Sequence, residues 1–137
     1  MANHAAILRV MDANLNRARE GLRVCEEVAC LVLEDLKLTG RIKRMRADLT
    51  AVARPLLPAK LLRSRDTGND AGHPIRRGKA KAHSAYRDLV MANAQRVQEA
   101  LRVLEEFTRL GSPRGARGFS LLRFRVYDLE QDLLRRL

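Results

Sequence analysis

The sequence predicts an all-α protein, a four-helix bundle made of two repeated helical hairpins. Apolar residues recur at helical spacing over long stretches, and a connection rich in glycine and charge divides the chain near its middle. In addition, the segment Ala13–Leu31 returns as Ala92–Leu110, with ten of 19 residues identical. Because one hairpin cannot bury its apolar stripe alone, we expect the two to pack about a pseudo-two-fold axis.

The chain length fits a single domain over residues 1–137. The expected parts are repeat 1 at about residues 4–58, a connecting loop at about 63–80 and repeat 2 at about 81–137.

The first hairpin begins with one long predicted helix, His4–Leu36, which contains no proline and one glycine, Gly21. Thr39 is the expected N-cap of a second helix, which should end near Pro55 or Pro58.

The second hairpin repeats this layout. A third helix is predicted over Lys81–Leu110, "GSPRGARG" (residues 111–118) reads as a turn, and a fourth helix is predicted over Phe119–Leu137. Its "LRFR" resembles "KRMR" at Lys43–Arg46. The connection Arg63–Lys81 has no helical period, and such long connections are usually functional or disordered.

Charge and composition limit the function classes. The net charge is +11, and residues 41–81 carry twelve basic and three acidic side chains, which would attract nucleic acid, an acidic membrane surface or a phosphorylated small molecule. Few aromatic residues argue against nucleic acid, and no apolar run is long enough for a membrane helix. A merely soluble, arginine-rich surface is the alternative.

Cys25 and Cys30 lie in one predicted helix, where their spacing suits neither a metal pair nor a disulfide, so we expect a cytoplasmic protein.

Polar residues inside the predicted apolar stripe are the first candidates for a site. Asn14 and Arg17, with their repeats Asn93 and Arg96, fall there, and an unpaired buried guanidinium would cost several kcal/mol. One interpretation is a buried structural network with acidic residues of the facing hairpin. The other is a cleft in which the arginines hold phosphate oxygens bidentately.

A second set lies together on a flank of the same helix. Glu20, Arg23 and Glu27 recur as Glu99, Arg102 and Glu106, and their spacing is typical of a solvated salt-bridge ladder. The recurrence favours a role in a shared cleft, with four candidate catalytic carboxylates: Glu20, Glu27, Glu99 and Glu106.

The connection offers a candidate metal site. Asp66 and Asp70 in "RDTGND" lie among basic residues and suit Mg²⁺, which commonly takes one or two protein carboxylates together with substrate phosphates. The alternative is a turn, because Asp, Gly and Asn are turn formers.

Four strings carry a resemblance to a known family: "MDANLNRAREGLRVCEEVACLVLED", "RSRDTGNDAG", "MANAQRVQEALRVLEEF" and "LLRFRVYDLEQDLL". They resemble the all-helical hydroxymethylpyrimidine phosphate kinase of thiamin biosynthesis, often fused in front of thiamine-phosphate synthase. The resemblance implies ATP-dependent, Mg²⁺-assisted phosphorylation of 4-amino-5-hydroxymethyl-2-methylpyrimidine phosphate to its diphosphate. It also implies that the matching positions form one cleft: the four glutamates, substrate-binding Asn14, Arg17, Arg23, Asn93 and Arg96, and metal-binding Asp66 and Asp70.

The sequence departs from the family pattern at two places, and other functions stay open. Cys30–Leu31 stands where the family suggests Arg-Phe, and Ala47 where it suggests His. Since no synthase domain follows Leu137, we expect coupling to thiamine-phosphate synthase in trans. The alternatives are a non-catalytic binder or sensor of a phosphorylated pyrimidine or nucleotide, and a basic helical nucleic-acid-binding protein. A homo-oligomer is compatible with the repeat.

Overall fold

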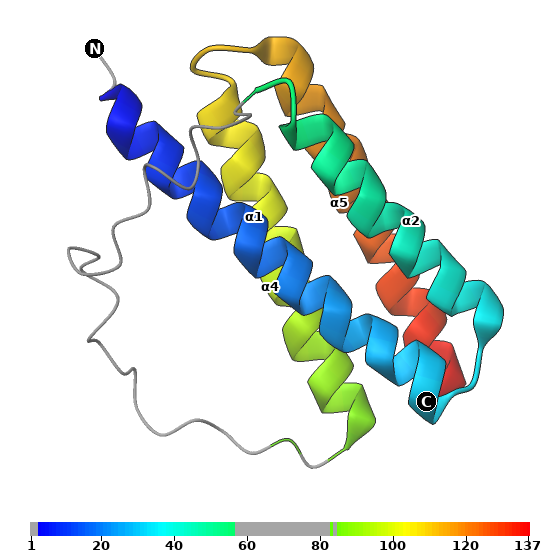
Figure 1. The fold of residues 1–137 in the computed structure, drawn as a ribbon. Helices are drawn as coiled ribbons and strands as arrows, with labels where there is room; N and C mark the ends of the chain where they lie inside the picture. The colour runs from blue at the N-terminus through cyan, green and yellow to red at the C-terminus, as the bar shows by residue number, and fades with distance from the viewer. Residues whose placement is uncertain (1–2, 57–82, 84) are drawn as a thin grey trace.

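The computed structural model describes residues 3–56, 83 and 85–137, and within these ranges every element is helical. Five elements follow along the chain: α1 (His4–Glu27), the π-helical turn η1 (Val28–Val32), α2 (Leu36–Ala53), α4 (Tyr86–Thr108) and α5 (Pro113–Arg136). They form an all-α four-helix bundle (Figure 1), as predicted. None of these described helices is long and apolar enough to cross a membrane.

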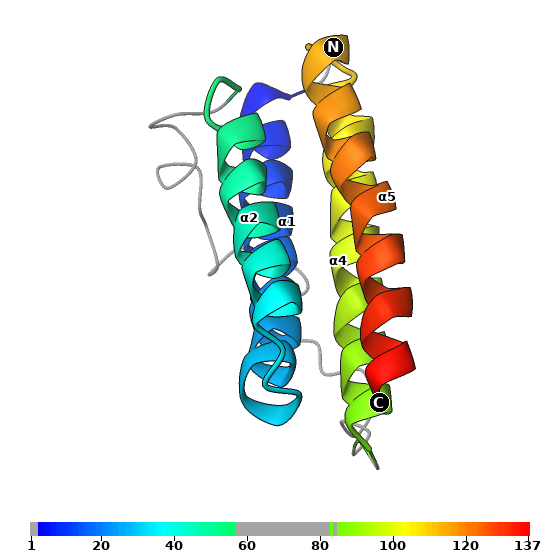
Figure 2. The ribbon, with the colours of Figure 1, turned by 90° about the vertical axis from the view of Figure 1, so that its right-hand side faces the viewer.

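The bundle consists of two hairpins packed side by side, α1 with α2 and α4 with α5 (Figure 2). Packing is most extensive between α1 and α4 and between α4 and α5, and thinner between α1 and α2 and between α2 and α5. The order around the bundle is therefore α1, α2, α5, α4. The pseudo-two-fold relation of the hairpins stays a prediction.

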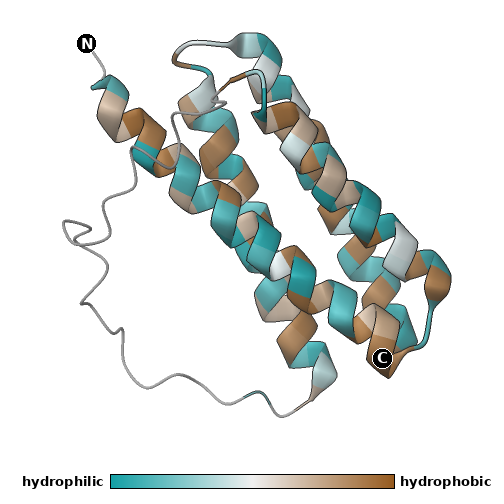
Figure 3. Ribbon diagram, in the orientation of Figure 1, coloured by the Kyte–Doolittle hydropathy of each residue, from teal (hydrophilic) through white to brown (hydrophobic). Residues whose placement is uncertain are grey.

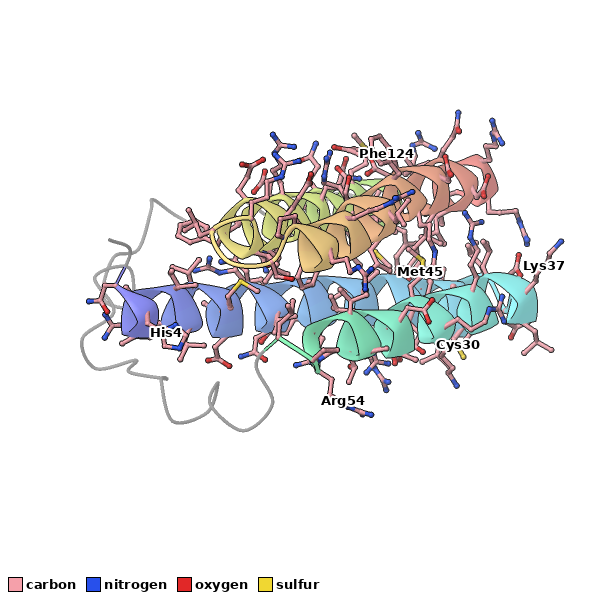
Figure 4. The ribbon with its side chains drawn as sticks, turned by 90° about the horizontal axis from the view of Figure 1, so that it is seen from above. His4, Cys30, Lys37, Met45, Arg54 and Phe124 are labelled. Carbon is pink, nitrogen blue, oxygen red and sulfur yellow. The ribbon has the colours of Figure 1, made fainter. Side chains whose placement is uncertain are left out.

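Each helix turns an apolar stripe towards a shared core, as the mixture of hydrophobic and hydrophilic residues along every ribbon indicates (Figure 3). Met45 of α2 lies between the hairpins and is buried, whereas Phe124 of α5 points away from the bundle (Figure 4). The largest fully buried side chains come from all four helices and include Leu15, Met45, Leu104 and Phe119.

The packing of α1 on α4 is closest at Gly21. A Cβ atom at this position would lie 2.5 Å from Val97 Cγ2 and 2.9 Å from the Asn93 carbonyl oxygen. Neither neighbour can move cheaply, because Val97 is β-branched and the carbonyl belongs to a helix backbone. The absence of a side chain at Gly21 therefore sets the separation of these two helices.

The predicted single helix His4–Leu36 is helical as far as Val32 and wrong in its last four residues. The chain ends α1 at Glu27, makes the π-helical turn η1 and reaches a left-handed backbone at Glu34, φ 52°. Asp35 then caps α2, since its carboxylate accepts a hydrogen bond from the Leu38 amide at 2.9 Å. Thr39, the predicted N-cap, is instead a buried residue inside α2, and its hydroxyl donates to the Asp35 carbonyl at 2.7 Å.

The predicted turn at residues 111–118 is also wrong, because α5 already begins at Pro113. Ser112 caps this helix by accepting from the Gly115 amide at 3.3 Å, and proline is favoured at a first helical position. Inside α5, a Cβ on Gly115 would approach Leu56 to 2.9 Å, and one on Gly118 would approach Val52 to 2.7 Å. These two glycines permit helix packing rather than a turn.

Ion pairs tie α2 to α5 across the thinner side of the bundle. Arg41 Nη1 lies 2.5 Å from Asp132 Oδ2, Arg125 Nη1 lies 2.8 Å from Asp48 Oδ2, and Arg136 pairs with the capping residue Asp35. A hydrogen bond from Arg41 lowers the pKa of Asp132. The partners are partly exposed, so each pair contributes little to the free energy of folding, but together they favour one register of the hairpins.

Gly21→Ala should destabilise the bundle, because overpacking costs about 1–3 kcal/mol and exceeds the gain of about 1 kcal/mol in helix propensity. Gly40→Ala in α2 is the matched control. Its new Cβ would meet only Arg44 Nη1, at 3.5 Å, so we expect this variant to be stabilised by about 0.5–1 kcal/mol. Urea denaturation measures both. Equal stabilisation of the two variants would contradict the close packing at Gly21.

The two cysteines are free, as predicted, and differ in reactivity. Burial raises the pKa of the Cys25 thiol to about 12, so at neutral pH it is protonated and shielded, whereas Cys30 is exposed. With a thiol reagent at pH 8, we expect fast reaction of Cys30 and reaction of Cys25 only on unfolding. The Cys30→Ser variant isolates the slow thiol, and fast labelling of that folded variant would contradict the assignment.

Candidate functional site

Each hairpin holds a buried glutamate bonded to an arginine of its second helix. In the first hairpin, Arg46 Nη1 donates to Glu26 Oε2 at 2.7 Å. In the second, Arg123 Nη2 donates to Glu105 Oε2 at 3.1 Å. Both glutamate side chains are only 3% exposed, so these charges are paired inside the protein rather than in water. Glu26 and Glu105 occupy the same position of the repeated segment.

The surroundings of Glu105 are the more heavily cationic. Arg109 Nη2 donates to Glu105 Oε1 at 3.0 Å, and Arg102 Nη1 lies 3.7 Å from Oε2. Burial lowers the pKa of Arg123, but hydrogen bonds with Tyr127 and Glu105 outweigh this effect and leave the pKa above its usual value. Arg123 is therefore a fixed cation, and its buried Nε has no hydrogen-bond partner among the described residues.

Arg17 and Arg96 do not lie in the apolar stripe, contrary to the prediction. Both are exposed, because they leave their helices at the edge of the stripe and extend into solvent. Asn14 is buried and Asn93 half-buried, and each amide donates to the carbonyl four residues earlier, at 2.9 Å. The helix backbone satisfies these two asparagines. Arg17 Nη1 also lies 3.4 Å from Asn14 Oδ1.

The predicted flank forms a salt-bridge ladder in both hairpins. Arg23 Nε lies 3.0 Å from Glu27 Oε1, and Arg102 Nη2 lies 2.9 Å from Glu106 Oε1. Each arginine also contacts the buried glutamate of its helix. Glu20 and Glu99 are exposed. The ladder interpretation is confirmed for Arg23 with Glu27 and for Arg102 with Glu106, and these arginines connect the surface to the buried charge.

A groove of about 650 Å³ runs between α4 and α5 beside the Glu105–Arg123 pair. It brings together Glu99, a predicted site residue, and Arg102, which the sequence analysis noted only as the repeat of Arg23, with side chains that were not singled out. The groove is lined by Gln95, Gln98, Glu99, Arg102, Val103, Arg123 and Tyr127. Gln98 Nε2 donates to Glu130 Oε2 at 2.5 Å, and the Arg123 guanidinium lies 5.1 Å from the centre of the Phe124 ring. The groove thus combines cations, amides, one carboxylate and a phenol.

A smaller groove of about 280 Å³ lies between α1 and α2, beside the Glu26–Arg46 pair. Its lining is Arg19, Lys43, Arg46, Ala47 and Thr50. Ala47, one of the departures from the family pattern, therefore lies in a groove.

The remaining predicted residues are not collected in one place by the described structure. Glu20, Glu27, Arg17 and Arg96 line neither groove. Asp66 and Asp70 lie outside the described residues, and within the described ranges no group of three or more His, Cys, Asp or Glu side chains could hold a metal ion.

Only part of what sequence interpretation missed had a signal in the repeat. Glu26 and Glu105 are identical at the common offset, but the arginines that bind them do not match: Arg46 is the last residue of "KRMR", whereas Arg123 is the first arginine of "LRFR". What the sequence did not reveal is that these four charges are paired at the helix interfaces.

Glu105→Gln should lower the free energy of unfolding by about 3 kcal/mol, since breaking a buried ion pair leaves an uncompensated charge at Arg123. Glu106→Gln is the matched control. Glu106 contacts the same Arg102 and Arg109, but its side chain is 43% exposed, so the expected loss is below about 1 kcal/mol. Urea denaturation compares the two, and equal losses would mean that the Glu105–Arg123 pair is not specifically stabilising.

Comparison with known proteins places the sequence in a family. A family model described as the ThiD2 family matches residues 9–132. A thiamine-phosphate synthase of Synechocystis sp. is 43% identical over 97% of this chain and 38% of its own length. Thiamine-phosphate synthases of Synechococcus sp. and Rhodopirellula baltica are 41% and 36% identical, over 93% and 96% of this chain and 35% of their own length.

The chain spans a little over a third of the length of these curated relatives. No solved structure matches it. The family model covers nearly the whole described bundle, including both buried ion pairs and both grooves. The chain belongs to the ThiD2 family.

Proposed function

We propose that this protein acts in thiamin biosynthesis as a kinase, which transfers a phosphoryl group from ATP to 4-amino-5-hydroxymethyl-2-methylpyrimidine phosphate. Family membership and the similarity to thiamine-phosphate synthases support the pathway, and the sequence resemblance supports the reaction. The structural observation that carries the proposal is the α4–α5 groove, in which a buried carboxylate holds Arg123 beside the exposed Arg102.

The groove offers a partner for each part of the proposed substrate. Arg102 and Arg123 suit a phosphate group, because guanidinium binds phosphate oxygens bidentately. The Glu99 carboxylate can accept from the exocyclic amine of the pyrimidine, and the Gln95 and Gln98 amides can bond to ring nitrogens. Tyr127 provides an aromatic face for stacking.

The reaction needs little covalent chemistry from the protein. An oxygen of the substrate phosphate attacks the γ-phosphorus of ATP; the new P–O bond forms as the bond to the β-phosphate oxygen breaks, and ADP leaves. The attacking oxygen is already anionic near neutral pH, so no general base is required. The absence of a histidine at Ala47 therefore does not remove an essential group.

The main task of the protein is to bring two anions together. Repulsion between the substrate phosphate and ATP is offset by fixed cations, and positioning supplies most of the rate enhancement. Of the four glutamates proposed as catalytic, Glu99 is the one that lines this groove, where we assign it to orienting the pyrimidine. Asp66 and Asp70 remain the proposed ligands of Mg²⁺, which would neutralise ATP phosphates. Thiamine-phosphate synthase is the proposed partner that takes the diphosphate.

ADP release tests the proposal with the monophosphate as acceptor and the unphosphorylated pyrimidine as the negative control. Arg102→Ala should lower kcat/KM by about tenfold or more, as the loss of one charge-assisted contact of about 1.5–3 kcal/mol implies. Arg23→Ala is the matched control. Arg23 contacts Glu26 and Glu27 as Arg102 contacts Glu105 and Glu106, but it lines neither groove, so the proposal does not retain the substrate-binding role that the resemblance implied for it. We expect its kcat/KM to stay unchanged.

Other outcomes separate the alternatives. Equal losses in Arg102→Ala and Arg23→Ala would contradict the α4–α5 groove as the site. Thermal stabilisation by the monophosphate without ADP release would indicate a non-catalytic binder. Binding to DNA or RNA that falls steeply with salt, with no response to ATP, would indicate a nucleic-acid-binding protein.

A further inference from the structure

We propose that the α1–α2 groove is a second anion-binding site, which takes the phosphate chain of a diphosphate or triphosphate. The groove holds about 280 Å³ and is lined by three cations, one hydroxyl and one methyl side chain. No carboxylate is among its lining residues. A concave site with this composition favours a multiply charged anion over a neutral or basic ligand.

Two of the three cations, Arg46 and Arg19, are held in place before any ligand arrives. Glu26 Oε2 accepts from Arg46 Nη1 at 2.7 Å, and the Arg46 side chain is still 33% exposed towards the groove. Its buried Nε has no hydrogen-bond partner within the described residues. On the opposite wall, Arg19 Nη2 lies 3.4 Å from Thr50 Oγ1. Preorganised donors reduce the entropy lost when an anion binds.

The repeat shows how this groove differs from the α4–α5 groove. Arg19 of α1 corresponds to Gln98 in the repeat. The second helices are matched by the arginines that bind the buried glutamates, Arg46 and Arg123. Counted from these, Lys43 corresponds to Ser120, and Ala47 and Thr50 correspond to Phe124 and Tyr127. The α1–α2 groove thus has cations at two positions where its counterpart has none. The α1–α2 groove therefore lacks the aromatic ring and the amides that could recognise a base, and it retains the features that recognise phosphate.

The position of the groove separates it from the proposed kinase site. Since the helices follow the order α1, α2, α5, α4 around the bundle, the α1–α2 and α4–α5 grooves lie on opposite edges. Each groove belongs to a different hairpin, and Figure 2 shows the two hairpins side by side. An anion in the α1–α2 groove cannot contact the groove assigned to the pyrimidine, so this site does not depend on the proposed function.

Calorimetric titration of inorganic pyrophosphate into the full chain tests the proposal. The double variant Arg19→Gln, Lys43→Ser gives the α1–α2 groove the residues of its counterpart, and we expect affinity to fall by about tenfold or more, as the loss of two charged contacts implies. The matched control is Arg9→Gln, Arg44→Ser, which removes two exposed cations from the same helices outside the groove. It should retain the affinity of the unmodified chain.

Further titrations identify the groove that binds the anion and the part of the ligand that is recognised. Arg102→Ala removes a cation of the α4–α5 groove, and it should leave unchanged the pyrophosphate binding that Arg19→Gln, Lys43→Ser weakens. This expectation is the same whether or not the kinase assay detects activity. Inorganic triphosphate and ATP should bind alike, and adenosine should not bind.

Three results would overturn the proposal. An equal loss of pyrophosphate affinity in the two double variants would mean that binding depends only on the net charge of the protein. A loss of affinity in Arg102→Ala alone would mean that pyrophosphate binds in the α4–α5 groove. Adenosine binding that the Arg19→Gln, Lys43→Ser variant abolishes would contradict recognition through phosphate.

Discussion

The buried contact between a glutamate and an arginine is the constraint on which each hairpin depends. An isolated carboxylate in the core would be prohibitively costly, so Glu26 and Glu105 require a cation from the neighbouring helix. Arg46 and Arg123 meet this requirement, which fixes how far each second helix can rotate and slide along the first. The same pairing leaves each guanidinium at the base of a surface groove. Under the two binding proposals, one arginine in each hairpin serves both the packing of the helices and the recognition of an anion.

The fold could be predicted because the relevant signals are local and repeated. Helical periodicity and the recurrence of Ala13–Leu31 identified α1 and α4, and the need to bury two apolar stripes implied a bundle. The errors arose where tertiary packing decides. Gly115 and Gly118 resemble turn residues until α5 is seen to approach Leu56 and Val52. Asp35 replaces Thr39 as the cap because the chain leaves α1 through η1.

The site was harder to predict because charge spacing does not reveal burial. Glu26 and Glu27 are adjacent, yet the first is buried and the second half-buried, and only the position of α2 distinguishes them. For Arg17 the error was the opposite one: it was predicted in the apolar stripe but is exposed. It lies at the edge of the apolar stripe, and its long side chain reaches water from there. The repeat contains the two buried glutamates at equivalent positions, whereas the assignment of each residue to core, ladder or groove required the helix interfaces.

The sequence separation of the buried pairs bears on the order in which this chain folds. Glu26 and Arg46 are 20 residues apart, and Glu105 and Arg123 are 18 apart, so each pair closes within its own hairpin. Contacts between the hairpins, such as that of Arg125 with Asp48, join residues 77 apart. Closing a long loop costs more entropy than closing a short one, and topologies rich in local contacts fold quickly. The buried glutamates can therefore pair with their arginines before the two hairpins associate. The non-local contacts then form in a later step, when the preformed hairpins dock.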